Sequence, residues 1–478
     1  MKDTLTIAQA RLGFEDPHNC TDSKDVLTLF TSFFDALVAY DPQMRFVPAL
    51  AESWHVADDA RTWTFTLRPG VTFHDGQAMD AEAVIYSLKR MARPDMGVTL
   101  GAPGVYNQYL AGIGLEILDR QTIRLILNEP LADLLDILVT GYVLPPAAVE
   151  RLGGGFKTAP IGTGPFEFVE HEKGVCFRAK KNPTYFQKGA GYDAIEWLLV
   201  PDPGERLRMV REGIAHMAVG PPFTVPPGDD GLNYVRSRGA TAYIVMFNAQ
   251  SGPFEDPRVR LALNLGVDRQ TLIQKVLNGA GYPLNGFVSP AHFGADPDLP
   301  PIAYDPERAE TLLKESGYGE GLNLTLDSPT SLPNEAVRLS EALSEQLSRI
   351  GVSVDIVYTE DRELYANKVR CKDIHDMCVF DSSPLSTYRV LKEKVDSRFK
   401  GSWWQGYHNY DVEKLIDAAQ ATPENHRREA IYKQCFRLLN EDPPWLYLYN
   451  AMNITCLAPH LSAWQAPAHG VIDPRYIG

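Results

Sequence analysis

The fold of this protein is decided between Asp41 and Arg90, in the segments Val47-Pro-Ala-Leu-Ala-Glu-Ser-Trp54, Thr62-Trp-Thr-Phe-Thr-Leu-Arg-Pro-Gly-Val-Thr-Phe-His-Asp-Gly76 and Asp80-Ala-Glu-Ala-Val-Ile-Tyr-Ser-Leu-Lys89. Trp63, Phe65 and Leu67 alternate with threonines, which is the period of a strand that buries one face. Pro69-Gly70 and Asp75-Gly76 supply the turns. We therefore predict a strand, a turn, a second strand, another turn and a helix.

The bulk composition indicates a globular protein of at least two lobes. Single hydrophobic cores stop growing near ~250–300 residues, and this chain has 478. No window reaches the ~18 apolar residues in a row that a membrane-spanning helix needs. The formal net charge is −15 and no run of Lys or Arg is present, so we expect no nucleic-acid partner.

The N-terminus and the cysteines bear on the compartment. Met1-Lys-Asp-Thr-Leu leads straight into an alternating strand, without the apolar run of a signal peptide. The chain is then either cytoplasmic or a mature form with Met1 added for expression. The six cysteines are too few for a disulfide scaffold. Cys371 and Cys378 flank a short connection, and either a disulfide between them or buried free thiols would fit.

The order of predicted elements indicates two crossings between lobes. Leu322–Leu326, Ala336–Ile350 and Gly351–Val357 read as strand, helix and buried strand, which is a parallel α/β unit. The apolar strand Tyr243–Asn248 precedes Asp256-Pro257, a good helix start. Trp445–Tyr449 is a later strand. The chain is thus expected to leave lobe one near Phe247 and to return near Tyr449, and two such crossings would form a hinge.

Several motifs together resemble a known family. The segments quoted from Pro48 to Val84 are similar to the signature of the extracytoplasmic solute-binding proteins, family 5, which serve peptide, nickel and opine ABC importers. Three further blocks match in order: Ala159-Pro-Ile-Gly-Thr-Gly-Pro-Phe166, Phe247-Asn248 through Asp256-Pro-Arg-Val-Arg-Leu-Ala-Leu-Asn264, and Tyr304-Asp-Pro-Glu-Arg-Ala-Glu-Thr-Leu-Leu313 with Ser316-Gly-Tyr318.

The resemblance implies an α/β, bilobal periplasmic-binding-protein fold of the large peptide-binding type (class II, cluster C), with two mixed sheets. Lobe one is expected over residues 1–246, with an inserted subdomain at about 40–160; lobe two over 247–447; and the return to lobe one over 448–478. The resemblance further implies a monomeric periplasmic protein that delivers a small molecule to the permease subunits of an ABC importer. Neither catalysis nor a cofactor is implied.

The resemblance also guides the choice of ligand-binding residues. Dipeptide-binding relatives hold the ligand's ammonium with an Asp and its carboxylate with an Arg on a nearby loop. Here the first segment reads Met377-Cys-Val-Phe-Asp-Ser-Ser-Pro-Leu-Ser-Thr-Tyr-Arg389, and Asp381 is the candidate ammonium partner. The second reads Asp327-Ser-Pro-Thr-Ser-Leu-Pro333 and has no Arg. This departs from a standard dipeptide pocket.

A compact polar group takes the place of that pocket. Ser382, Ser383, Ser386 and Thr387 lie beside Asp381 and Arg389 in the sequence, and hydroxyl, carboxylate and guanidinium groups suit a charged, hydroxyl-rich solute such as an opine. A di- or oligopeptide, or a nickel chelate, remains an alternative. The predicted ligand-binding residues are Asn19, Cys20, Thr21, Tyr142, Asn248, Asp381, Ser382, Ser383, Arg389, Trp403 and Trp404. No cluster of His or carboxylates predicts a metal site.

Each candidate has a structural alternative. Trp54, Trp63 and Phe65 are expected in the core, and His74-Asp75 belongs to a turn rather than to a catalytic dyad. Asp381 could cap a helix instead of binding ligand. Trp403 and Trp404 are adjacent, so at most one faces a given side of an extended segment.

Two other classes of function are compatible with a chain of this size. A secreted hydrolase would need a Gly-x-Ser-x-Gly nucleophile elbow, which the chain lacks. A chaperone for extended peptides is the other. The sequence leaves open the ligand's identity, the cysteine pairing, any lipid anchor, and which of Trp403 and Trp404 lines the site.

Overall fold

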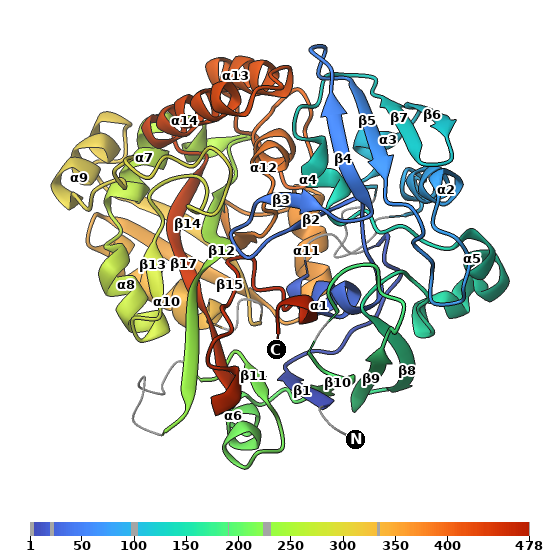
Figure 1. Ribbon diagram of the computed structural model, residues 1–478. Coiled ribbons are helices and arrows are strands. Elements are labelled where there is room, and N and C mark those ends of the chain that lie inside the picture. The colour runs from blue at the N-terminus through green and yellow to red at the C-terminus, as the bar shows by residue number, and fades with distance from the viewer. Residues whose placement is uncertain are drawn as a thin grey trace. The chain divides into compact units, whose positions relative to one another are not determined.

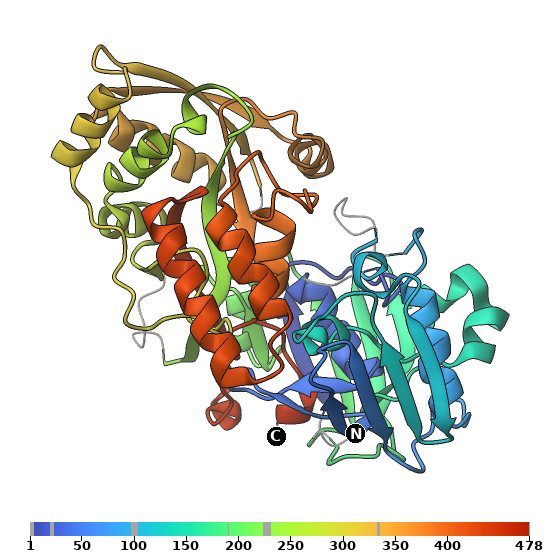
Figure 2. The same ribbon diagram turned by 90° about the horizontal axis from the view of Figure 1, so that it is seen from above.

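The computed structural model of the protein describes residues 4–19, 23–96, 104–189, 191–222, 231–331 and 335–477. These residues form two compact units (Figures 1 and 2). Unit 1 holds the described residues up to 237 together with those from 453 onward, and unit 2 holds 238–452. The chain passes from one unit to the other within β12 (Asn233–Phe247) and returns within β17 (Trp445–Leu457). No described helix combines the length and the apolar character that a membrane crossing requires.

The main sheet of unit 1 is mixed. β1 (Thr4–Gln9) pairs in parallel with β10 (Ala194–Leu199) and with β11 (Met217–Val219), and the end of β17 pairs antiparallel to β11. β9 (Cys176–Lys181) and β8 (Phe166–Glu172) extend the sheet as an antiparallel hairpin. Helix α1 (Lys24–Phe33) packs on this sheet through aromatic side chains, and its Phe30 and Phe33 are fully buried there.

The predicted strand-turn-strand-helix segment forms a second sheet in unit 1. β4 (Ala51–Val56), β5 (Thr62–Leu67), β7 (Thr122–Ile126) and β6 (Gly114–Asp119) are all antiparallel, and α2 (Ala81–Met91) follows (Figure 1). Trp63 and Phe65 are buried, as the alternation predicted, whereas Trp54, which was also expected in the core, is only half-buried. Asp80 caps α2 by accepting the N–H of Ala83.

The remaining elements of unit 1 are short. They are β2 (Val38–Tyr40), β3 (Phe46–Pro48), α3 (Asn107–Leu110), α4 (Leu134–Leu138), α5 (Pro146–Leu152), α6 (Pro203–Arg211) and the 3-10 turns at Gly153–Thr158, Pro459–Leu461 and Pro474–Tyr476.

Unit 2 is built on a sheet in the order β15-β14-β16-β12-β17. β14 (Leu322–Pro329) is parallel to both β15 (Val352–Thr359) and β16 (Met377–Ser382), while β12 is antiparallel to β16. The predicted parallel unit is therefore confirmed, with α10 (Ala336–Ser348) as its crossover helix. The prediction that Gly351–Val357 is a buried strand is wrong, because β15 is an edge strand with exposed residues.

Helices surround the sheet of unit 2. Asp256 caps α7 (Pro257–Leu265), with Pro257 as its first residue, as predicted. Helices α13 (Tyr410–Gln420) and α14 (Asn425–Glu441) pack side by side (Figure 2). The other elements are α8 (Arg269–Leu277), β13 (Gly281–Pro283), α9 (Pro306–Glu315), α11 (Arg362–Arg370), α12 (Thr387–Lys394) and a 3-10 turn at Gly252–Glu255.

Candidate functional site

The carboxyl end of β16 carries three of the predicted site residues of unit 2, namely Asp381, Ser382 and Ser383, whereas Asn248 lies at the opposite end, beside the connection that enters β16. β14, β15 and β16 run in the same direction, so their carboxyl ends meet at one edge of the sheet. Open α/β sheets bind ligands outside the carboxyl ends of their strands, because the loops there present backbone and side-chain polar groups. The segments that leave this edge begin at Thr330, Glu360 and Ser383.

Asp381 carries a charge at this edge that the described residues leave without a partner. It lies on β16 opposite Tyr243 of β12 and is half-buried. Its backbone carbonyl accepts a hydrogen bond from Lys394 Nζ at 3.4 Å. Its carboxylate makes no hydrogen bond or ion pair within the part of the chain that the structure describes. The alternative role as a helix cap does not apply, since Ser386 caps α12 by accepting the N–H of Arg389.

The other polar residues after β16 have internal partners. Ser382 is buried, and its Oγ accepts a hydrogen bond from Lys394 Nζ at 3.1 Å. Thr387 Oγ1 donates to the carbonyl of Phe293 at 2.6 Å. Arg389 is buried, and its Nε donates to Glu393 Oε1 at 2.9 Å one turn along α12. Ser383 is half-buried between these anchored residues. Glu393 of α12 pairs with Arg389, whereas no residue of α12 pairs with the carboxylate of Asp381.

Trp403 and Trp404 occupy different surroundings. Trp403 is half-buried and its ring lies 4.8 Å from that of Phe380, the residue before Asp381. Trp404 Nε1 donates to the carbonyl of Tyr407 at 2.6 Å, and Lys400 lies over its ring. Trp403 is therefore the tryptophan that packs on β16, through the side chain of Phe380.

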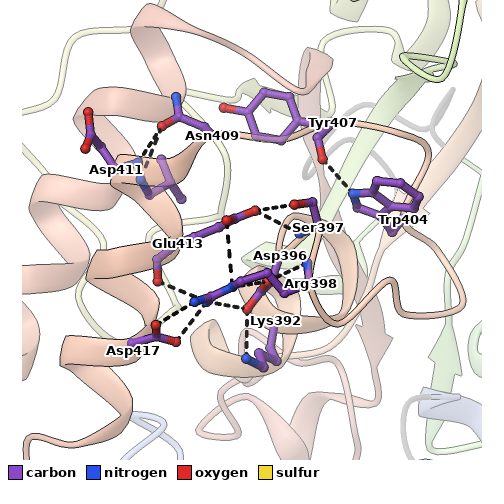
Figure 3. A network of polar contacts seen from close by, with 11 residues as sticks. Lys392, Asp396, Ser397, Arg398, Trp404, Tyr407, Asn409, Asp411, Glu413 and Asp417 are labelled. Carbon is purple, nitrogen blue, oxygen red and sulfur yellow. Dashed lines mark hydrogen bonds and ion pairs between the residues drawn. The ribbon is translucent and has the colours of Figure 1, made fainter.

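The loop that carries these tryptophans is held by a dense ion network (Figure 3). Asp396 is fully buried and accepts hydrogen bonds from Lys392 Nζ at 2.7 Å and from Arg398. These partners hold the pKa of Asp396 at about 2, against the opposing effect of burial. Arg398 also reaches Asp417 of α13 at 2.6 Å, and Ser397 Oγ donates to Glu413 Oε1. The loop between α12 and α13 is thus tied to both helices.

Lys372 also anchors the loop between α12 and α13. Its Nζ donates to the carbonyls of Gly401 at 3.0 Å and Ser402 at 2.6 Å. Burial lowers the pKa of this lysine to about 8. Its φ of 63° is left-handed, which is uncommon for a residue with a side chain. Gln405 adds a further tie through its Nε2, which donates to the carbonyl of Val369 at 2.7 Å.

Asn248 directly follows β12, and its side chain bonds to backbone groups of the protein. Its Nδ2 donates to the carbonyls of Ile374 and His375, at 3.2 and 3.0 Å. Its Oδ1 accepts the N–H of Gln250 at 3.3 Å. These bonds fix the connection that leads into β16.

The predicted contacts of unit 1 lie near a buried histidine. Cys20 and Thr21 fall outside the described residues. The N–H of Asn19 donates to the carbonyl of Asp16 at 2.8 Å. Tyr142 is 5% exposed and packs edge-on against Phe30, so its ring belongs to the core. Its carbonyl accepts from His18 Nε2 at 2.8 Å.

The ring of His18 is locked between two elements. Arg90 Nη1 of α2 donates to His18 Nδ1 at 2.9 Å and to Asp16 at 2.8 Å. Burial, with Arg90 beside it, lowers the pKa of His18 to about 4. The imidazole therefore stays neutral, and it joins the segment before residue 20 to α2 and to Tyr142.

The two cysteines that flank the connection before β16 are not joined in a disulfide. Cys371 is exposed, Cys378 is fully buried, and both are free thiols. Within the described ranges, His, Cys, Asp and Glu side chains form no group of three or more that could hold a metal ion. His375 donates through Nδ1 to Asp327 at 3.0 Å.

Sequence reasoning missed Arg362 and Tyr243 at this edge, and it missed Lys372, which precedes β16 and holds the loop of the tryptophans. An arginine or lysine next to a helix end is usually solvated, and no sequence signal separates such residues from these. Their role depends on contacts with residues far along the chain, as for Lys372 with Ser402.

Comparisons with known proteins place these features in context. Residues 45–396 match the family described as bacterial extracellular solute-binding proteins, family 5 Middle. The glutathione-binding protein GsiB of Salmonella paratyphi A is 28% identical over 485 residues, covering 98% of this chain and 93% of that protein. GsiB of Escherichia coli (strain K12) is 26% identical with the same coverage.

Solved structures with the same fold cover nearly the whole chain. HbpA2 from Haemophilus parasuis superposes with a TM-score of 0.85 at 20% identity, covering 100% of this chain and 99% of that one. AgaA from A. tumefaciens R10, in complex with agropinic acid, gives a TM-score of 0.82 at 22% identity, covering 99% and 98%.

Proposed function

The chain belongs to the bacterial extracellular solute-binding proteins of family 5, and we propose that it captures a small zwitterionic peptide of the glutathione class, with Asp381 as the partner of the ligand's ammonium group. The bilobal periplasmic-binding-protein fold and the role of an ABC-importer substrate-binding protein agree with the prediction from sequence. The choice of ligand is the new element.

The observation that carries this proposal is the available carboxylate of Asp381. A half-buried carboxylate that lacks a partner is costly, whereas a charge-assisted hydrogen bond to an ammonium group contributes about 1.5–3 kcal/mol. Ser382, Arg389 and Thr387 have internal partners, so they support a hydroxyl-rich ligand less than the sequence suggested. The name of GsiB, a glutathione-binding protein of similar length, supports a peptide with free amino and carboxyl groups.

The wider role follows from the family. We infer that the mature protein works as a monomer in the periplasm and presents its peptide to the permease subunits of the importer. The sequence-based lobes, with a hinge at the two crossings, remain part of this proposal. The passage of the chain through β12 and β17 supports it.

Isothermal titration calorimetry tests the proposed ligand class. The panel contains glutathione, N-acetylglutathione, alanyl-alanine, agropinic acid and nickel with L-histidine. We expect the tightest binding for glutathione and a large loss on N-acetylation, because acetylation removes the ammonium charge. The variant Asp381→Asn should weaken glutathione binding about tenfold to a hundredfold.

A matched control is Asp355→Asn, which removes an exposed carboxylate from the edge strand β15. It should bind glutathione like the wild-type protein. Binding of agropinic acid or of nickel with histidine, without binding of either peptide, would replace the proposed ligand by that compound. Equal affinity of Asp381→Asn and wild type for glutathione would remove Asp381 from the site.

A further inference from the structure

Arg362 is a half-buried guanidinium at the same sheet edge as Asp381. It is the first residue of α11, which starts just after the carboxyl end of β15. Its Nε is buried and has no hydrogen-bond partner among the described residues. A guanidinium carries five N–H donors, and a buried donor without an acceptor destabilises the folded state. An acceptor for this donor would therefore have to come from outside the described chain.

Nearby acids do not neutralise Arg362. Glu360, Asp361 and Glu363 flank it in the sequence, yet none of them forms an ion pair with it in the described part of the chain. Asp361 accepts the N–H of Leu364 at 2.9 Å and so serves as the N-cap of α11. The guanidinium keeps its charge available although acidic residues stand on both sides.

Aromatic rings hold Arg362 in place instead. Its Cζ lies 5.6 Å from the ring centroid of Phe380 and 6.0 Å from that of Tyr365. Tyr365 is itself fixed, because its hydroxyl donates to the carbonyls of Asp327 and Val379, at 3.1 and 2.6 Å. The cation–π contact orients the guanidinium while leaving its N–H groups unused. Such a preorganised planar fork matches a carboxylate.

Phe380 holds this guanidinium near the end of β16 that also carries Asp381. Asp381 is the next residue of β16, and Trp403 packs on the same ring of Phe380. Because side chains alternate along a strand, the guanidinium on the Phe380 ring and the Asp381 carboxylate lie on opposite faces of β16, and they share the carboxyl end of that strand. A zwitterionic molecule presents the complementary pair of charges.

We propose that Arg362 binds a carboxylate of the captured zwitterion. This assignment rests on the proposed function and names the second charge of the same site. It also accounts for the loop from Asp327 to Pro333, which contains no arginine: α11 supplies the guanidinium from the neighbouring strand end. Asp381 and Arg362 together would select ligands that carry both an amino and a carboxyl group.

The test compares glutathione with glutathione diethyl ester in calorimetry. The wild-type protein should bind the diester about tenfold to a hundredfold more weakly, as expected for the loss of a charge-assisted hydrogen bond. Arg362→Gln should lose a similar factor for glutathione and should bind the diester no more weakly than the wild type does. Arg362→Lys keeps the charge without the fork and should fall between them.

The control is Arg349→Gln, which removes an exposed guanidinium paired with Glu345 on α10. It should leave both affinities unchanged. The diester comparison uses unmodified protein, so it stays informative even if Arg362→Gln lowers the melting temperature. In that case Arg362→Lys replaces it in the cycle.

The outcomes separate the two proposals. If the wild-type protein does not bind glutathione, the ligand class is wrong and this assignment falls with it. If glutathione binds and Asp381→Asn weakens it, while both Arg362 variants match the wild type, only the assignment of Arg362 is overturned. That assignment is also overturned if Arg362→Gln loses as much affinity for the diester as for glutathione.

Discussion

His74 Nε2 donates a hydrogen bond to the carbonyl of Gly164 at 3.0 Å. Its Nδ1 accepts the N–H of Gly162 at 3.2 Å, and its own backbone N–H donates to the Gly162 carbonyl at 2.8 Å. Two motifs that lie far apart in the sequence, the turn at His74-Asp75-Gly76 and the segment from Ala159 to Phe166, are therefore one structural unit. Burial lowers the pKa of His74, which keeps the ring in the neutral form that these bonds require.

The packing of this loop against α1 explains why residues 162 and 164 are glycines. A Cβ on Gly162 would lie 2.0 Å from the carbonyl oxygen of Phe33, and one on Gly164 would lie 2.5 Å from the Phe33 carbonyl carbon. The loop can approach the end of α1 closely only without side chains at these positions.

We predict that Gly162→Ala destabilises the protein by more than about 3 kcal/mol, or prevents folding, because its Cβ collides with backbone atoms. Gly154→Ala is the matched control, since a Cβ there meets open space. It should change the free energy of unfolding by less than about 0.5 kcal/mol. Urea denaturation of the two variants measures the difference. Equal stability of the two would contradict the proposed close approach.

The buried pair of Asp35 and Arg475 fastens the C-terminal segment to unit 1. Arg475 Nη1 lies 3.1 Å from Asp35 Oδ1, and Thr163 Oγ1 donates to Asp35 Oδ2 at 2.9 Å. Burial raises the pKa of Asp35 even with Arg475 beside it. Arg475→Met should cost about 3–5 kcal/mol by leaving a buried carboxylate without its cation.

Asp35→Asn in the Arg475→Met background should recover part of that loss, because it removes the uncompensated charge. Lys275→Met, which breaks an exposed ion pair with Glu345, should cost less than about 1 kcal/mol. Urea unfolding of the four proteins gives these values. A double variant no more stable than Arg475→Met would argue against a charge effect.

Acid should weaken unit 2 through His292. Its Nε2 donates to the carbonyl of Pro384 at 2.9 Å, and its Nδ1 accepts from Ser289 Oγ at 3.0 Å. Burial lowers the pKa of His292 from 6.5 to about 4. Between these pH values the unfolded chain binds a proton that the folded chain does not, so stability falls as the pH drops.

The variant His292→Gln should remove about one proton from the acid dependence of the unfolding free energy between these pH values. His426→Gln, at an exposed position of α14, should leave that dependence as it is. Urea midpoints measured at several pH values test both. Parallel curves for wild type and His292→Gln would exclude the histidine as the source.

Loss of the anchor at Lys372 should loosen the loop that carries Trp403. Lys372→Met removes two hydrogen bonds to the carbonyls of Gly401 and Ser402, which contribute about 0.5–1.5 kcal/mol each. We expect a red shift of tryptophan emission and weaker glutathione binding. Lys173→Met, in the exposed turn of the β8–β9 hairpin, is the control. Unchanged emission in Lys372→Met would show that the loop is held by its other contacts.

Local patterns gave much of the fold. The alternation of Trp63, Phe65 and Leu67 gave β5, and Asp256-Pro257 gave the start of α7. Both depend on neighbours in the chain, through the period of a strand and the hydrogen bonds of a helix cap. The edge position of β15 could not be read in the same way, because strand order is set by contacts between distant segments.

The candidate site shows the same division. The sequence by itself determined individual strands, turns and helix caps, since these depend on a few neighbouring residues, and its resemblance to family 5 implied the two-lobe fold and pointed to Asp381. Only the tertiary structure decided which charges are available: Glu393 neutralises Arg389 on α12, whereas Arg362 meets rings from α11 and β16 and no carboxylate of the described chain. The reason is physical, since a buried charge is governed by the groups that folding brings against it.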